Sequence, residues 1–169
     1  MSHQNFAGYA GDLLAINAYT LLEGDSSSVF VDVRTQAEWA YVGNPDLRAL
    51  RKTPLFLEWQ SYPSMAVDAN FAARLEEMLQ SAGVDRGASL VFLCRSGARS
   101  RQAAIAMTSA GWAPCFNISD GFEGPLDGSR HRSGVSGWKA GGLPWTQTLS
   151  VQPCPVPWHR RIVGCPPRA

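Results

Sequence analysis

The chain has 169 residues, of which 45% are hydrophobic and 17% charged, and its formal net charge is +1. This size fits one domain with or without an appendage, and the composition excludes a disordered or fibrous protein. A nearly neutral chain lacks the strong positive charge that non-specific nucleic-acid binding requires. No apolar run is long enough to span a membrane, and the chain does not begin with a basic segment followed by an apolar one. We therefore expect a cytoplasmic protein with no nucleic-acid and no membrane partner.

Strand and helix patterns alternate along most of the chain. Short apolar runs rich in β-branched residues predict strands, and apolar residues three or four apart predict helices. In chain order, the expected elements are a helix at 13–22, a strand at 29–33, a helix at 35–40, a strand at 55–57, a helix at 68–82, a strand at 89–93, a helix at 98–110 and a strand at 115–118. Asp68 is expected to cap the clearest helix and Gly83 to end it. Residues 43–46 and 119–135 are expected to be loops, before a last helical turn at 136–141.

This order predicts an α/β fold, in which a parallel sheet of about five strands is joined by right-handed crossovers and flanked by helices on both faces. The strand at 89–93 is apolar throughout, which is typical of a strand covered on both sides. Ligands of such sheets bind beyond the carboxyl ends of the strands. Cys94 is expected at that end of a central strand.

The composition changes after residue 149. The last twenty residues contain five prolines and three arginines, and they contain no acidic residue. Prolines at this density break regular structure. We therefore expect one domain at residues 1–149, followed by a Pro-rich, Arg-containing C-terminal tail at residues 150–169.

Residues 90–101, LVFLCRSGARSR, place the end of a strand, a loop and the start of a helix within twelve residues. The helix offers unpaired N–H groups and the positive end of its dipole, and Gly97 allows the backbone to curl tightly. Such a loop binds anions, so Cys94 is expected to be a thiolate at neutral pH. Arg95 and Arg99 add positive charge. The pattern predicts a nucleophilic sulfur in an anion-binding cradle, with a buried structural cysteine as the alternative.

Two chemistries suit a thiolate in an anion-binding loop: attack on phosphorus, which forms a phosphoenzyme, or attack on sulfur, which forms a persulfide. Cysteine phosphatases have a Cys-x5-Arg loop that fits a tetrahedral phosphate. Here the second arginine, Arg99, follows Cys94 after only four residues, and Ser100 stands where the phosphatase arginine would be. The smaller ring favours an outer sulfur atom over a phosphate.

Three segments in order, VDVRTQAEW at 31–39, LCRSGARS at 93–100 and GWKAGGLPW at 137–145, resemble the signatures of the rhodanese family of single-domain sulfurtransferases. The resemblance covers about residues 13–145 and implies a rhodanese-like α/β fold, with no metal and no organic cofactor. It also implies a persulfide on the catalytic residue, Cys94, stabilised by the loop that follows. The residues expected to bind the substrate are Arg95, Ser96, Gly97, Ala98, Arg99 and Ser100.

The segment after the first signature departs from the family. The usual Gly-His-Ile is absent, and YVGNPD stands at residues 41–46. The insert at residues 47–63, which contains Trp59 and Tyr62, is therefore expected to shape the pocket differently.

We expect a thiosulfate sulfurtransferase. Its donor is thiosulfate or a similar small anion, and its acceptor is cyanide, a cellular thiol or a protein thiol. Two alternatives use the same residues. One is a persulfide-carrying or anion-binding regulatory module without turnover, and the other is a cysteine phosphatase or arsenate reductase, which the loop length disfavours.

Several charged residues are expected to have structural roles. Asp32 and Arg34 are expected to form an ion pair that holds the loops. One of the two loop arginines is expected to be anchored by a carboxylate such as Asp32 or Glu38, which would leave the other to bind the donor. His131 lies in a loop between two arginines, and nothing local would position it as a catalytic base.

The other three cysteines are not expected to be the catalytic nucleophile. Cys115 is expected to be an inert core thiol, with a resolving role as the alternative. Cys154 and Cys165 lie in the tail, where they could pair with each other.

Overall fold

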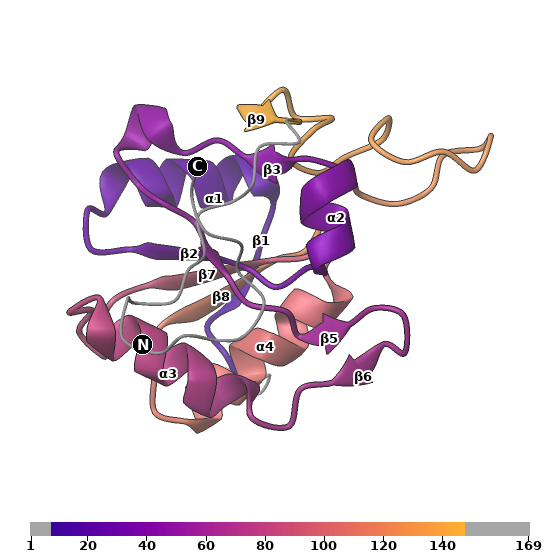
Figure 1. Cartoon of the computed structure of the whole chain (residues 1–169). Coiled ribbons are helices and arrows are strands. Elements are labelled where there is room, and N and C mark those ends of the chain that lie inside the picture. Colours follow the sequence, from indigo (N-terminus) through magenta and orange to yellow (C-terminus); the bar gives the residue numbers. More distant parts are fainter. Residues whose placement is uncertain (1–7, 148–169) are drawn as a thin grey trace, which may run out of the picture.

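The computed structural model describes residues 8–147. The expected tail, with Cys154 and Cys165, lies outside the described residues. Five strands form one parallel sheet in the order β1-β8-β7-β2-β4 (Figure 1). From edge to edge they are β1 (Gly11–Leu13), β8 (Cys115–Ile118), β7 (Leu90–Leu93), β2 (Val29–Asp32) and β4 (Leu55–Phe56). The α/β fold class with a five-stranded parallel sheet is therefore confirmed.

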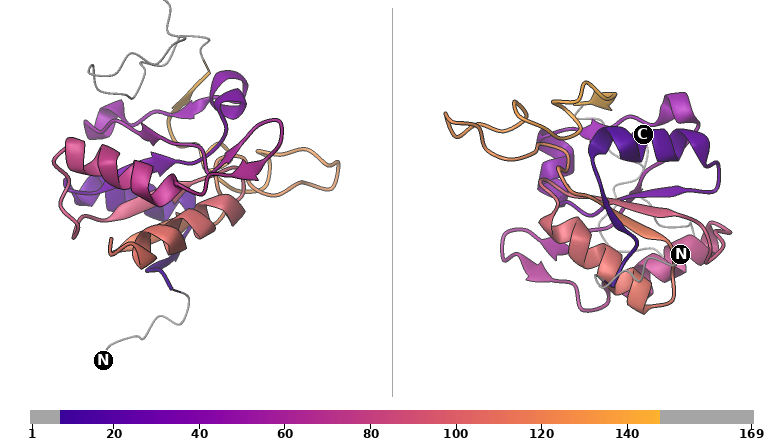
Figure 2. Two further views of the ribbon diagram at one scale, coloured as in Figure 1. Left: turned by 60° about the horizontal axis from the view of Figure 1, so that its bottom comes forward. Right: turned by 180° about the vertical axis from the view of Figure 1, so that it is seen from behind.

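Helices cover both faces of this sheet. Helix α1 (Ala15–Gly24) lies on one face, and α3 (Phe71–Ser81) and α4 (Ala98–Ser109) lie on the other (Figure 2). Each helix connects two parallel strands, as crossovers in α/β sheets do. Among residues 8–147, no helix combines the length and the apolar character that crossing a membrane would require.

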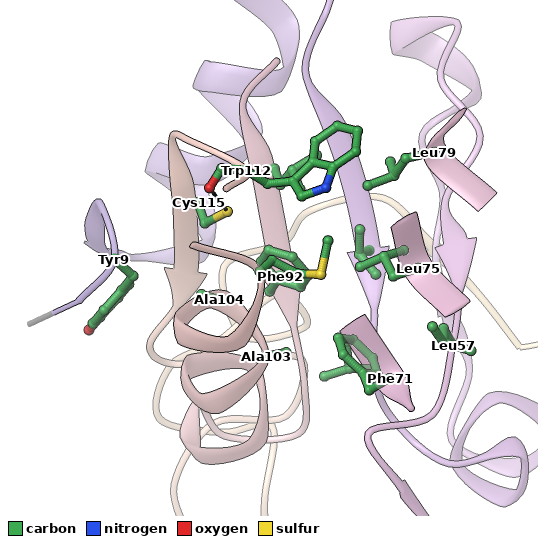
Figure 3. Close-up of a cluster of buried hydrophobic side chains, with 14 of the residues drawn as sticks. Tyr9, Leu57, Phe71, Leu75, Leu79, Phe92, Ala103, Ala104, Trp112 and Cys115 are labelled. Carbon is green, nitrogen blue, oxygen red and sulfur yellow. Dashed lines mark hydrogen bonds between the residues drawn. The ribbon is translucent and has the colours of Figure 1, made fainter. Parts of the chain in front are cut away.

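The central strand β7 explains where the core sits. Its four residues are all buried because both faces of the strand are covered. Leu90 and Phe92 pack in the cluster formed with α3 and α4 (Figure 3), whereas Val91 and Leu93 pack in the cluster formed with α1. The strand therefore delivers Cys94, the next residue, to a buried position at the carboxyl edge of the sheet.

Short elements surround this edge. They are α2 (Gln36–Tyr41), the two-residue strands β3 (Asn44–Pro45), β5 (Gln60–Ser61), β6 (Ala66–Val67) and β9 (Trp145–Thr146), and the 3-10 turn η1 (Arg48–Leu50). Strand β3 pairs antiparallel with β9, and β5 pairs antiparallel with β6. The expectation of a plain loop at residues 43–46 was therefore wrong, because β9 provides a partner from the far end of the domain.

Two expected helix starts need correction. Leu13 ends the edge strand β1, because its carbonyl accepts a hydrogen bond from Ser119, and helix α1 begins only at Ala15. Asp68 does not cap α3. Its amide is bonded to Trp59, its carboxylate accepts from the Asn70 amide, and the helix begins at Phe71.

The C-terminal end of α3 confirms the prediction that Gly83 ends this helix. Gly83 follows it with φ +70°, and its N–H bonds back to the carbonyl of Gln80. The single helical turn expected at residues 136–141 is present in part, because the N–H of Gly141 bonds to the carbonyl of Gly137 at 2.8 Å, but a longer helix does not form. The amides of the two residues after Gly137 bond to another segment. The N–H of Trp138 bonds to Gly121 and the N–H of Lys139 bonds to Phe122.

Candidate active site

The loop after β7 is held by the segment that follows β8. The carbonyl of Cys94 accepts a hydrogen bond from the amide of Phe122 at 2.8 Å. The carbonyl of Arg95 accepts from Glu123 at 3.0 Å and from Gly124 at 3.2 Å. These bonds turn the loop's carbonyls toward the neighbouring segment, so its amides can face the other way, toward the sulfur.

Gly97 is required at the turn into α4. It has φ +94°, and a Cβ built at this position would lie 2.2 Å from the carbonyl oxygen of Ser119. A side chain would therefore force the loop away from the segment that holds it, in addition to the strain of the positive φ. The sequence-based role of Gly97 as the residue that lets the loop curl is confirmed.

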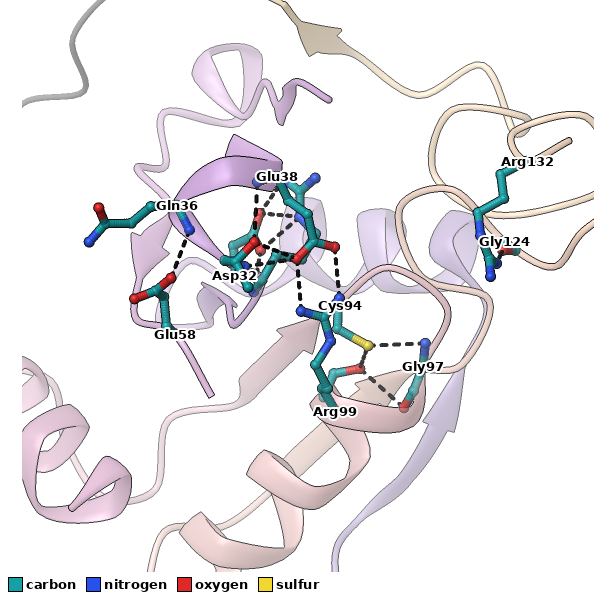
Figure 4. A network of polar contacts seen from close by, with 12 residues as sticks. Asp32, Gln36, Glu38, Glu58, Cys94, Gly97, Arg99, Gly124 and Arg132 are labelled. Atoms are coloured by element: carbon teal, nitrogen blue, oxygen red, sulfur yellow. Dashed lines mark hydrogen bonds and ion pairs between the residues drawn. The ribbon is translucent and has the colours of Figure 1, made fainter. Parts of the chain in front are cut away.

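The sulfur of Cys94 lies at the N-terminus of α4, and the residue is only 1% exposed. The N–H of Gly97 donates to Sγ at 3.1 Å, and the hydroxyl of Ser100 lies 3.0 Å from Sγ (Figure 4). The other N–H groups of the first turn have no hydrogen-bond partner inside α4, as at any helix start. Together with the helix dipole, these groups favour the binding of an anion at the start of α4.

The hydroxyl of Ser100 has one proton and three acceptors within reach. Besides Sγ, it lies 2.6 Å from Oδ1 of Asn117 and 3.2 Å from the carbonyl of Gly97. The amide nitrogen of Asn117 donates to Asp12 at 2.8 Å, which turns its oxygen toward Ser100. Asn117 therefore competes with the sulfur for the proton of Ser100.

Arg99 is anchored by a carboxylate. Its guanidinium donates to both oxygens of Glu38, at 2.7 and 2.8 Å, and both side chains are mostly buried (Figure 4). Glu38 also completes the capping box of α2, in which it accepts from the amide and the hydroxyl of Thr35. Burial opposes ionisation of Glu38, but these bonds outweigh it and lower its pKa to about 2. Arg99 thus ties the start of α4 to the start of α2.

Arg95 is the loop arginine that stays available. It is exposed and lines the pocket above Cys94, and its side chain has no ion pair with any residue between 8 and 147. Asp32 is already engaged, because Arg34 binds it in a fully buried ion pair with a shortest N–O distance of 2.6 Å. The expected structural pair of Asp32 and Arg34 is therefore confirmed, and Glu38 is the carboxylate that anchors one loop arginine.

A pocket of about 650 Å³ opens above the sulfur. Its floor is the loop from Cys94 to Arg99, and its polar wall includes Thr35 and Glu38. The other walls come from the end of α2 and from the β5–β6 hairpin. The apolar and aromatic side chains of these walls are Ala37, Tyr41, Val42, Tyr62 and Met65. Tyr41 and Tyr62 are about 70% exposed, so both stand at the rim.

The expected substrate-binding residues do not all face the sulfur. Arg95, Ser96, Ala98 and Arg99 line the pocket, whereas Gly97 and Ser100 are buried beneath it. The insert at residues 47–63 does reach the pocket, through Gln60 and Tyr62, but Trp59 packs against the α3 side of the core instead.

Cys115 is an inert core thiol, as expected. It is buried and contacts the carbonyl of Trp112, and burial raises its pKa to about 11. It pairs with Leu90 across the sheet, four residues before Cys94. That offset is about 13 Å along a strand, too far for a disulfide. His131 is exposed on the loop after β8 and does not line the pocket.

Sequence reasoning missed the residues that reach the site from other elements. Tyr41 and Met65 line the pocket from α2 and the β5–β6 hairpin, and neither position carries a local signal. Asn117 could have been found, because it is a polar residue inside an otherwise apolar strand that neighbours β7. Such a residue needs a buried partner, and here the partner is Ser100.

Residues 11–150 match the family described as the STR4 middle domain. The chain belongs to this family. Two relatives of this chain are the uncharacterized protein RP600 homolog of Rickettsia rickettsii and the uncharacterized protein RC0915 of Rickettsia conorii. Each is 37% identical over 134 residues, which cover 79% of this chain and 95% of the relative.

Two solved structures resemble this STR4 middle domain. Rv0390 from M. tuberculosis has 42% sequence identity and a TM-score of 0.74, and the match covers 83% of this chain and 99% of that one. The polysulfide-sulfur transferase homodimer from Wolinella succinogenes has 22% identity and a TM-score of 0.53, with 85% and 82% covered. The second likeness concerns the fold alone. The fold is the rhodanese-like α/β fold expected from the sequence.

Proposed function

We propose that this protein is a sulfurtransferase that carries sulfur as a persulfide on Cys94. The observation that carries the proposal is the placement of the Cys94 sulfur at the N-terminus of α4, on the floor of a pocket. The fold-level likeness to a polysulfide-sulfur transferase supports it. The thiolate of Cys94 attacks the outer sulfur of thiosulfate or a similar anionic donor.

The atoms balance without a metal or a redox partner. A bond forms between Sγ and the outer sulfur of the donor, the sulfur–sulfur bond of thiosulfate breaks, and sulfite leaves with the electron pair. Cys94 then carries a terminal sulfur, which the open N–H groups at the start of α4 stabilise. A thiophilic acceptor such as cyanide or a thiol removes this sulfur and regenerates the thiolate.

Arg95 is the residue proposed to bind the donor. It is the loop arginine that no carboxylate of the described residues neutralises, and guanidinium groups bind the oxygen atoms of such anions through paired hydrogen bonds. Arg99 holds the loop in shape through Glu38 and contributes less directly. The serine at position 100 supports sulfur over phosphate chemistry, because a buried hydroxyl occupies the place of the phosphatase arginine.

Steady-state assays test this proposal. The parent protein should produce thiocyanate from thiosulfate and cyanide, and it should have negligible activity on an aryl phosphate. Cys94→Ser should abolish thiocyanate formation, whereas Cys115→Ser serves as the matched control and should retain it. Turnover in Cys94→Ser, or efficient phosphate hydrolysis by the parent, would overturn the proposal.

A further inference from the structure

A row of polar contacts joins the Cys94 sulfur to the edge of the sheet. The hydroxyl of Ser100 lies 3.0 Å from Sγ and 2.6 Å from Oδ1 of Asn117. The amide nitrogen of Asn117 in turn donates to Oδ1 of Asp12 at 2.8 Å. Ser100 and Asn117 are buried, whereas Asp12 is exposed on the edge strand β1. The row therefore connects a buried sulfur to a carboxylate at the protein surface.

The sheet holds Asp12 and Asn117 next to each other. Asp12 is the register partner of Asn117 in the pairing of β1 with β8, and Asn117 is the register partner of Phe92 in the pairing of β8 with β7. Asn117 is thus fixed between the edge strand and the strand that ends just before Cys94. The hydroxyl of Tyr9 also donates to Oδ1 of Asp12, at 2.7 Å, and helps to hold this carboxylate in place.

The chemistry of these groups gives the row one direction. An ionised carboxylate only accepts hydrogen bonds, so the amide nitrogen of Asn117 faces Asp12 and its oxygen faces Ser100. That oxygen also only accepts, so it takes the single proton of the Ser100 hydroxyl at the shortest contact of the row. The sulfur then faces a lone pair of the Ser100 oxygen. This arrangement suits a protonated Cys94, whose S–H can donate to Ser100, and it withholds the serine proton from a thiolate.

We propose that Asp12 is a positioning residue that sets the direction of this row and thereby holds back the reactivity of Cys94. The inference rests on the proposed function only in taking Cys94 as the nucleophile. Without the carboxylate, the Asn117 amide can turn over, so that its nitrogen donates to Ser100 and the serine hydroxyl donates to the sulfur. A hydrogen bond to a charged group favours the charged form, and the thiolate is the form of cysteine that attacks.

The same hydroxyl bears on the removal of sulfur from Cys94. When an acceptor takes the outer sulfur, the sulfur–sulfur bond breaks and its electron pair returns to Sγ. A hydrogen bond from Ser100 would stabilise the sulfur in this step as well. Asp12 therefore slows both half-reactions, although its own side chain lies at the far end of the row.

The test measures the rate at which iodoacetamide, a neutral reagent, alkylates Cys94 in the full-length protein between about pH 4 and pH 10. Trypsin releases Cys94 in the peptide of residues 87–95, apart from the other three cysteines, so mass spectrometry follows this one thiol. Thermal unfolding of each variant shows whether it is folded.

In Asp12→Ala the pH profile of alkylation should move toward lower pH. On the rising limb of the profile, Cys94 should react roughly 3–10-fold faster than in the parent, which is the effect of about one hydrogen bond. Asp12→Asn is the matched control, because its side-chain oxygen can still accept from Asn117 and should keep the parental profile. Asp12→Ala should have no further effect in a Ser100→Ala background, because the hydroxyl that transmits the effect is absent.

The two substitutions at position 12 separate orientation from charge. Both remove the same negative charge, so a purely electrostatic influence of Asp12 would move both profiles equally. The other charged side chains near the sulfur and the row stay the same in every variant; they are Arg95, Arg99, Glu38, Asp32, Arg34 and Arg101.

Three results would overturn the positioning role of Asp12. They are an unchanged or slower Asp12→Ala protein, an equal change in Asp12→Asn, and an effect of Asp12→Ala that persists in the Ser100→Ala background. The proposed function fails by a different result, the absence of added sulfur on Cys94 after exposure to thiosulfate. Alkylation needs no sulfur donor, so it decides the role of Asp12 whether or not Cys94 transfers sulfur.

Discussion

Replacing Glu38 by glutamine tests how the Cys94 loop is anchored. Glu38 is ionised in the folded protein, with its pKa lowered from 4.5 to about 2 by Arg99 and Thr35 against the effect of burial. A lowering of this size corresponds to about 3 kcal/mol of stabilisation of the ionised carboxylate. Because both side chains keep some exposure to solvent, we expect Glu38→Gln to lower the free energy of unfolding by about 2–3 kcal/mol at pH 7.

The pH dependence separates this ion pair from simple packing. A carboxyl with a lowered pKa contributes its full stabilisation above its unfolded value of 4.5, and the contribution disappears as the pH falls through about 2. In urea unfolding, the difference between parent and Glu38→Gln should therefore shrink to about 1 kcal/mol at pH 3. Glu76→Gln, in the exposed pair with Arg86, is the matched control and should cost less than about 1 kcal/mol. A Glu38→Gln difference that stays constant from pH 7 to pH 3 would refute the electrostatic explanation.

Four further substitutions test the remaining parts of the site. Arg95→Ala should raise the KM for thiosulfate and lower kcat/KM on the order of 10–100-fold, as expected for one lost charged hydrogen bond, and unchanged kinetics would exclude Arg95 as the donor-binding residue. In Asn117→Leu the Ser100 hydroxyl should donate to the sulfur of Cys94, and alkylation of Cys94 at pH 6 should become severalfold faster. Ser100→Ala removes this donor and should slow the alkylation of Cys94. Slower alkylation in both variants would contradict the competition between Asn117 and the sulfur for the Ser100 proton. Gly97→Ala should lower thermal stability by about 1–3 kcal/mol, and a crystal structure with an unmoved loop would contradict the clash with Ser119.

The loop around Cys94 could be predicted because its determinants are local. A buried strand, a glycine and the start of a helix follow one another within twelve residues, and each has a sequence signal. The anchoring of one arginine could be predicted only as a choice between two carboxylates. The structure selects Glu38 because Asp32 is already bound by Arg34 inside the core.

The parts that escaped prediction depend on distant partners. Strands of two residues such as β3 and β5 show no alternation of polar and apolar residues, and they exist only because β9 and β6 pair with them. The walls of the pocket come from these same short elements and from the end of α2. Asn117, a polar residue in an otherwise apolar strand, signals a buried partner, but that this partner is Ser100 depends on the pairing of β8 with β7 and not on any local pattern.

The central claim is that Cys94 accepts sulfur from an anionic donor. Intact-protein mass spectrometry after brief exposure to thiosulfate, followed by removal of the excess, tests it most directly. The parent and Cys115→Ser should each gain the mass of one sulfur atom and lose it on addition of cyanide, while Cys94→Ser should gain none. A parent protein that never gains this mass, or a Cys94→Ser variant that gains it, would contradict the account.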